Sequence, residues 1–148
     1  MLASMLAPAA FLALWSLLML GWMGHARFRA IARLRIDLAA TPAGARGQQL
    51  EGVLPDVVMW KSHNYTHLME QPTVFYPLVF ILALLGPSSL EVGLAWTYVG
   101  LRVLHSLWQA IVNTIPVRIA LFTVSTLVLF GLALETCWRV LPLALQGG

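Results

Sequence analysis

Polar and ionisable side chains recur at helical spacing within an otherwise apolar segment, LEVGLAWTYVGLRVLHSLWQAIVNTI. At about 100° per residue they share one narrow face of a helix: Glu91, Tyr98, Arg102, His105, Gln109 and Asn113. An arginine in a segment of membrane length is costly unless it faces a bundle interior, a wet cavity or a partner charge. Arginine together with histidine and amide groups suits an anionic ligand such as a carboxylate, thiolate or phosphate. The stripe therefore predicts a polar site that other segments must complete.

The preceding apolar segment offers a second polar face. His63, His67 and Glu70 are spaced i, i+4 and i+7, so they lie on one side of a helix. This is also the spacing of helical metal ligands, and His105 would complete a ligand set. Such spacing is common by chance, so we favour a polar site without a metal.

The two polar faces should meet in the same part of the molecule. If successive helices alternate in direction, Glu70 and His105 lie at comparable depth, and Arg118 begins the last apolar run nearby. Two interpretations stay open for Arg102 and Glu70. They form an ion pair that only joins two helices, or they belong to a ligand site. For Arg118 the alternatives are contact with lipid head groups and an anionic neighbour.

Composition restricts the class of protein more sharply than any motif. The chain has 148 residues, of which 59% are hydrophobic and only 10% charged, and its mean hydropathy is +0.80. A soluble domain carries about 25% charged residues, so the chain is predicted to be an integral membrane protein. A single cysteine, Cys137, excludes an internal disulfide.

The apolar runs predict an all-α integral membrane protein, a four-transmembrane-helix up-down bundle with one domain over residues 1–148. The expected spans cover about residues 5–24, 58–86, 90–115 and 117–137. Pro72 and Pro77 should interrupt or kink the second span. A cleaved signal peptide is the alternative for the first span, although no basic residue precedes Arg27.

The basic residues predict the orientation. The only sizeable loop, expected at residues 26–55, holds five arginines: Arg27, Arg29, Arg33, Arg35 and Arg46. The loop near residues 86–89 holds no Lys or Arg. By the positive-inside rule, residues 25–57 should be cytoplasmic and both termini outside. The arginines are expected to contact membrane lipids, and we expect no nucleic-acid partner.

Two runs, NYTHLMEQPTVFYPL and YVGLRVLHSLWQAIVNTIPVR, resemble the membrane-associated proteins in eicosanoid and glutathione metabolism, the MAPEG family. The resemblance covers roughly residues 61–132 and rests on Glu-x-Pro, Arg-x-x-His and the arginine after Pro116. It is nearest to the bacterial members, which implies a bacterial inner membrane. The resemblance also implies a homotrimer that binds glutathione as cosubstrate between neighbouring subunits, near the cytoplasmic side.

The resemblance implies a role for each predicted site residue. Glu70 matches a glutamate that contacts the glutathione amine, and Arg118 matches the arginine that stabilises the thiolate and would be catalytic. The glutathione-binding residues would be His67, Glu70, Arg102, His105, Gln109 and Asn113. The chain departs from the family at six positions. It has His67 where members often carry asparagine and Ile119 where they carry serine. It has Gln109 and Phe122 in place of tyrosines, and His63 and Thr66 in place of arginines.

The function implied is a glutathione-dependent transferase or peroxidase that acts on lipophilic electrophiles, with an arginine-stabilised thiolate. The departures keep an alternative open, in which the same fold is a non-catalytic membrane scaffold or a lipid-binding protein.

Overall fold

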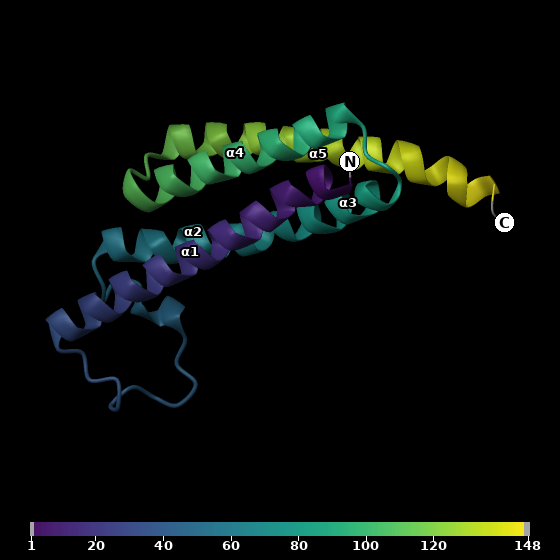
Figure 1. Cartoon of the computed structure of the whole chain (residues 1–148). Coiled ribbons are helices and arrows are strands. Elements are labelled where there is room, and N and C mark those ends of the chain that lie inside the picture. Colours follow the sequence, from purple (N-terminus) through teal and green to yellow (C-terminus); the bar gives the residue numbers. More distant parts are fainter. Residues whose placement is uncertain (1, 147–148) are drawn as a thin grey trace.

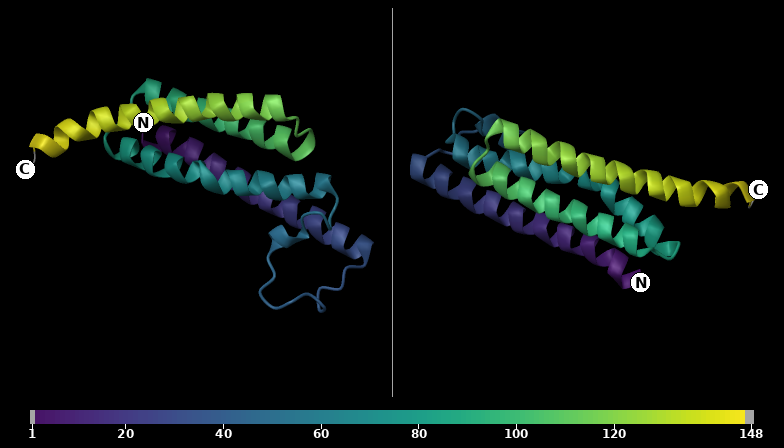
Figure 2. Two further views of the ribbon diagram at one scale, coloured as in Figure 1. Left: turned by 180° about the vertical axis from the view of Figure 1, so that it is seen from behind. Right: turned by 90° about the horizontal axis from the view of Figure 1, so that it is seen from above.

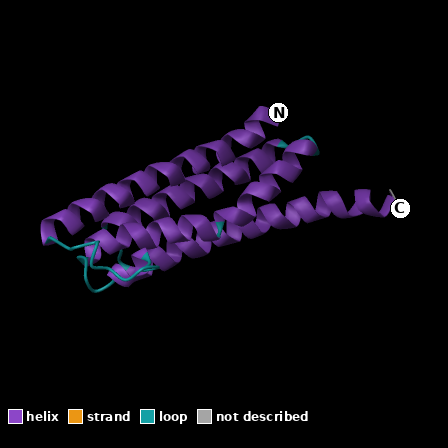
Figure 3. Ribbon diagram, turned by 90° about the horizontal axis from the view of Figure 1, so that it is seen from below, coloured by secondary structure: helices purple, strands orange, loops and turns teal. Residues whose placement is uncertain are grey.

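The computed structural model describes residues 2–146 and contains helices and loops only over that range (Figure 3). The elements are α1 (Leu2–Leu34), the 3-10 turn η1 (Gly47–Leu50), α2 (Asp56–Glu70), α3 (Pro72–Leu84), α4 (Ser89–Ile111) and α5 (Ile115–Gln146). Helices α2 and α3 continue one another, so the chain makes four antiparallel rods in up-down-up-down order (Figure 1).

The two ends of this bundle differ. Both termini and the α3–α4 turn lie at one end, which we call the termini end (Figures 1 and 2). The long loop after α1 and the α4–α5 turn lie at the other, the loop end. The last turns of α5 extend beyond the other helices at the termini end (Figure 2).

Three of the four rods are long and apolar enough to cross a membrane: Leu2–Leu34, Asp56–Leu84 and Ile115–Leu145. The fourth rod, α4, packs against α1, α2 and α5. It carries the polar stripe, which lowers its hydropathy and which these neighbours cover. An all-helical chain with such spans is an integral membrane protein.

The polar stripe of α4 is buried as predicted, except at its last residue. Glu91, Tyr98, Arg102, His105 and Gln109 are each no more than 1% exposed. Asn113 was expected on the same helix, but α4 ends at Ile111 and Asn113 lies in the α4–α5 turn. Its φ is +57°, a left-handed conformation that asparagine tolerates better than most residues.

Proline residues explain two helix boundaries. Pro72 has no N–H and its ring disfavours a continuous helix, so the second rod breaks at Gln71 as predicted. Pro77 lies inside α3, which continues to Leu84. Pro116 is the second residue of α5, where a missing N–H costs nothing because the first N–H groups of a helix have no intrahelical acceptor.

The prediction of a loop from residue 26 is wrong, because α1 continues to Leu34. Ala30 and Ile31 on this extension pack against Leu54 and Met59, which form a small second core beside α2. Burying these apolar side chains favours a longer helix over an early loop. Arginines that were expected in a loop therefore stand on a helix: Arg27, Arg29 and Arg33.

The main core lies along the middle of the bundle and towards the termini end. It is made of apolar side chains from α1, α2, α3, α4 and α5: Met5, Leu12, Met19, Leu68, Phe75, Leu82, Val99 and Leu132.

At the termini end, α5 is fastened to the α3–α4 turn by an ion pair that the sequence did not predict. Arg139 Nη1 donates to both carboxylate oxygens of Glu91 at 2.9 Å, and Nη2 donates to the carbonyls of Leu85 and Gly86 at 2.8 and 3.1 Å. Glu91 also accepts from the backbone N–H of Ser88, where it completes a capping box for α4.

Candidate functional site

A cavity of about 220 Å³ opens in the loop-end half of the bundle, where α2, α4 and α5 meet. Four of its lining residues belong to the predicted site: His67, Glu70, His105 and Arg118. Ile119 and Phe122 complete the wall. Three segments far apart in the sequence thus bring an arginine, a carboxylate and two imidazoles to one place.

His105 supplies a buried imidazole to this wall. The residue is 1% exposed, and its Nε2 has no hydrogen-bond partner within the described residues. Its ring stacks on that of His67, with centroids 5.9 Å apart, and lies 6.1 Å from the ring of Phe122. A buried polar atom without a partner is rare and costly, and it often marks a binding site.

Gln109 orients His67 from outside the cavity. The His67 Nδ1 and Gln109 Oε1 atoms are 3.0 Å apart. Because an amide oxygen only accepts, the His67 Nδ1–H is the donor of this hydrogen bond. Gln109 is fully buried and does not line the cavity, so it positions His67.

Asn113 has the same relation to Arg118. The guanidinium Nη1 of Arg118 donates to Asn113 Oδ1 at 2.9 Å, across the turn that joins α4 to α5. Since the side chain of Asn113 also lies outside the cavity lining, the left-handed turn at Asn113 serves to fix the arginine.

Arg102 does not line this cavity, and of the two interpretations left open for it, the ion pair with Glu70 does not form within residues 2–146. Its Nη2 donates to the backbone carbonyl of His67 at 2.6 Å, and its Nη1 lies 3.4 Å from Gln71 Oε1. Within residues 2–146, Glu70 forms no ion pair. The helix break at Pro72 frees backbone carbonyls of α2 inside an apolar bundle, and Arg102 supplies donors there.

Gln71 is a residue that sequence reasoning missed. Besides accepting from Arg102, its Nε2 donates to Thr126 Oγ1 at 2.6 Å and so ties the helix break to α5. Its place directly before a proline, in the middle of a span, was the signal that would have drawn attention to it.

The alternative of a metal site finds no support in the part of the chain that the structure describes. No group of three His, Cys, Asp or Glu side chains there lies close enough to share an ion. His63, which shares a sequence pattern with His67 and Glu70, instead contacts Glu51 at 3.2 Å.

Comparison with protein families identifies the fold. The model of the MAPEG family matches residues 5–138. The chain belongs to the MAPEG family. The match includes most of α1 and most of α5, and so extends beyond the two runs that first suggested the resemblance. It does not support the narrower bacterial assignment. Comparison with curated proteins and with solved structures gives no match.

As a MAPEG protein, this chain has a half-apolar site. Ile119 and Phe122 line the cavity at positions where the resemblance implied serine and tyrosine hydroxyls. The polar half keeps one cation in Arg118, one carboxylate in Glu70 and two imidazoles. Such a set can bind a molecule that carries both charges, and it can hold an anionic sulfur or oxygen beside the guanidinium.

Proposed function

We propose that this MAPEG protein is a glutathione-dependent transferase or peroxidase that acts on lipophilic electrophiles at the α2–α4–α5 cavity. One observation supports the proposal above all. Arg118, Glu70 and the partly unsatisfied imidazole of His105 meet in one cavity between α2, α4 and α5.

The charged side chains of the cavity, Glu70 and Arg118, fit the charged groups of glutathione. Glu70 would accept hydrogen bonds from the amine of the tripeptide, and its exposed carboxylate has no competing ion pair in residues 2–146. Arg118 would hold its positive charge beside the thiol, which favours the reactive thiolate. In a transferase reaction the sulfur forms a bond to an electrophilic carbon, and the leaving group departs with its electron pair.

A neighbouring copy of the chain would complete the site. Pockets that enclose drug-sized ligands measure about 300–1,000 Å³, which exceeds the 220 Å³ found here. A single subunit therefore encloses only part of a tripeptide. Glu70 is exposed within a candidate membrane span, where lipid is a poor neighbour for a carboxylate. Both features favour an oligomer with the cavity at the subunit interface, and the resemblance to the family implies that this oligomer is a homotrimer.

The lengths of the helices and the positions of the arginines support an arrangement in the membrane. At about 1.5 Å per residue, the 23 residues of α4 extend for about 35 Å beside the other rods, and we assign α4 as the fourth span. By the positive-inside rule, the arginines on the loop side of α1 support a cytoplasmic loop end with both termini outside. The electrophile would enter the cavity laterally from lipid.

The test is glutathione binding and turnover by the detergent-solubilised oligomer. Isothermal titration should detect binding, and ultraviolet absorbance should detect bound thiolate. Arg118→Gln should lower kcat with a model electrophile by about 10²–10³-fold, the usual cost of removing a group that stabilises developing or resident negative charge. Arg46→Gln, in the exposed loop, is the matched control and should leave turnover unchanged.

The alternative is a non-catalytic scaffold or lipid-binding protein of the same fold, which the apolar Ile119 and Phe122 favour. It predicts no glutathione binding at millimolar concentration and no thiolate absorbance. It also predicts that Arg118→Gln changes neither the oligomer nor any activity.

A further inference from the structure

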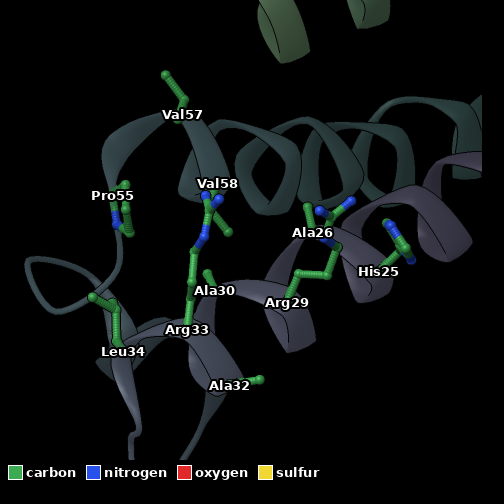
Figure 4. A pocket seen from close by; sticks show the side chains of 10 residues that line it. All are labelled: His25, Ala26, Arg29, Ala30, Ala32, Arg33, Leu34, Pro55, Val57 and Val58. Carbon is green, nitrogen blue, oxygen red and sulfur yellow. The ribbon is translucent and has the colours of Figure 1, made fainter.

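A groove of about 670 Å³ lies at the loop end between the last turns of α1 and the start of α2, well away from the α2–α4–α5 cavity (Figure 4). Its lining combines two kinds of side chain. Ala26, Ala30 and Val58 contribute apolar surface, and His25, Arg29 and Arg33 contribute nitrogen donors.

The three basic residues form a row along one side of α1. They are spaced i, i+4 and i+8, which places them one above another on the helix. Figure 4 shows the Arg29 and Arg33 side chains extending from α1 on the side of the groove. The row therefore presents its donors along the groove.

These donors have no acceptor in the described part of the chain. Neither Arg29, Arg33 nor His25 makes an ion pair within residues 2–146. Arg27, which faces another side of α1, differs because it donates to Ser62 Oγ at 2.6 Å. Arg29 and Arg33 are exposed and no carboxylate of the described residues pairs with them, so their guanidinium groups are free to bind an anion from outside the chain.

The depth of the groove indicates where that acceptor lies. With 33 residues at about 1.5 Å each, α1 is about 50 Å long, whereas about 20 residues suffice to cross the hydrocarbon core. The last third of α1, which carries the row, therefore reaches the level of the lipid head groups. Apolar residues continue from the groove into the span.

We propose that this groove binds an anionic phospholipid. The head-group phosphate would lie against Arg29 and Arg33, and an acyl chain would follow the apolar surface of Ala26, Ala30 and Val58 towards the membrane. Charge complementarity selects an anion, and the apolar floor beside the row selects a molecule with a hydrocarbon chain over a free anion.

The test is native mass spectrometry of the delipidated oligomer in a mild detergent, with phosphatidylglycerol or phosphatidylcholine added. We expect the wild-type protein to retain phosphatidylglycerol in preference. The double variant Arg29→Gln/Arg33→Gln should weaken this binding by about fivefold for each arginine, since a basic residue near an anionic surface contributes about 1 kcal/mol.

The matched control is Arg35→Gln/Arg46→Gln. It removes the same charge from the same end of the molecule but from residues that do not line the groove, so it should bind phosphatidylglycerol as the wild type does. The charge-preserving variant Arg29→Lys/Arg33→Lys should retain most of the binding.

Three results would overturn the proposal. Equal losses in the two glutamine variants would show that only the overall charge attracts lipid. Equal retention of the two lipids by the wild type would show that no anion is recognised. Displacement of phosphatidylglycerol by inorganic phosphate would show that the row binds phosphate without a lipid chain.

Discussion

The termini end and the loop end of the bundle each bury polar groups around an arginine, and the two clusters differ in how far these groups are paired. At the termini end, the Glu91 carboxylate accepts from Arg139 and from the backbone of Ser88, and the remaining Arg139 donors reach two carbonyls. At the loop end, the Nε2 of His105 and the Nε2 of Gln109 have no partner within residues 2–146.

This difference separates architecture from binding. In an apolar bundle an unsatisfied polar group costs several kcal/mol, so a fully paired cluster suits a purely structural role. The Glu91–Arg139 cluster meets that condition. The cavity that contains His105 does not, which is expected if a ligand supplies the missing partners. An unpaired atom indicates a binding site only where its residue lines a cavity, because Tyr98 Oη and Arg102 Nε also have no partner among the described residues but line no cavity. Both clusters contain arginine, so residue type alone does not reveal the role.

The largest effect should follow from breaking the paired cluster. Glu91→Ala leaves Arg139 beside two carbonyls without its counter-charge. We expect a loss of about 3 kcal/mol in the free energy of unfolding, at the low end for a broken buried pair because the Arg139 side chain is 28% exposed. Unfolding in mixed micelles of SDS and a mild detergent measures this loss. Glutathione affinity per folded oligomer should not change.

The control is the double variant Glu91→Ala/Arg139→Met. Because replacing both partners leaves no unpaired charge, this variant should be more stable than Glu91→Ala alone. If the double variant is as unstable as the single one, the packing of the Glu91 side chain matters and its ion pair does not.

A change at His105, in the cavity with unpaired polar atoms, should have an intermediate effect. It should preserve or raise stability and lower glutathione affinity. His105→Phe keeps a ring against His67 and Phe122 and removes the ring nitrogens. The free energy of unfolding should stay the same or rise by up to about 1 kcal/mol, because a buried unsatisfied atom disappears. Glutathione affinity should fall about tenfold, the equivalent of one hydrogen bond to a charged ligand at about 1.5 kcal/mol.

Thermal unfolding with and without glutathione measures both quantities on one sample. Phe122→Leu is a suitable control, because it alters the same wall without removing a polar atom. A variant His105→Phe that loses stability without ligand would contradict the comparison, since it would show that His105 is already satisfied within the fold.

The sequence predicted the membrane class, the helix directions and the buried face of α4, because these depend on composition and on helical periodicity. From depth in alternating helices, the sequence also predicted one shared site for His67, Glu70, His105 and Arg118. All four residues line the cavity. The sequence could not predict the pairing of Glu91 with Arg139. These residues are 48 positions apart, and their contact depends on how far α5 extends past the α3–α4 turn.

The errors have a common physical cause. Both interpretations of Arg102 gave it a side-chain or ligand partner, because sequence patterns compare side chains, whereas its shortest hydrogen bond goes to the backbone carbonyl of His67. Asn113 was placed on a helix because periodicity does not reveal where a left-handed residue ends one. In both cases the backbone of a helix end decided the outcome, and a periodic pattern contains little information about helix ends.

The smallest expected effect tests whether Arg102 serves the architecture or the neighbouring site. Its two Nη atoms have partners, and its Nε has none among the described residues. Arg102→Met removes the donors to the His67 carbonyl and to Gln71 but keeps an apolar stem in a 1% exposed position. Hydrogen bonds between membrane helices average about 0.6 kcal/mol, so two of them predict a loss of about 1 kcal/mol in the free energy of unfolding. Glutathione affinity should change by less than about twofold, because Arg102 does not line the cavity.

Gln71→Leu removes one of the same bonds together with the bond to Thr126, and it should act in the same direction on stability. A large fall in affinity for Arg102→Met with unchanged stability would move Arg102 from the architecture into the binding site.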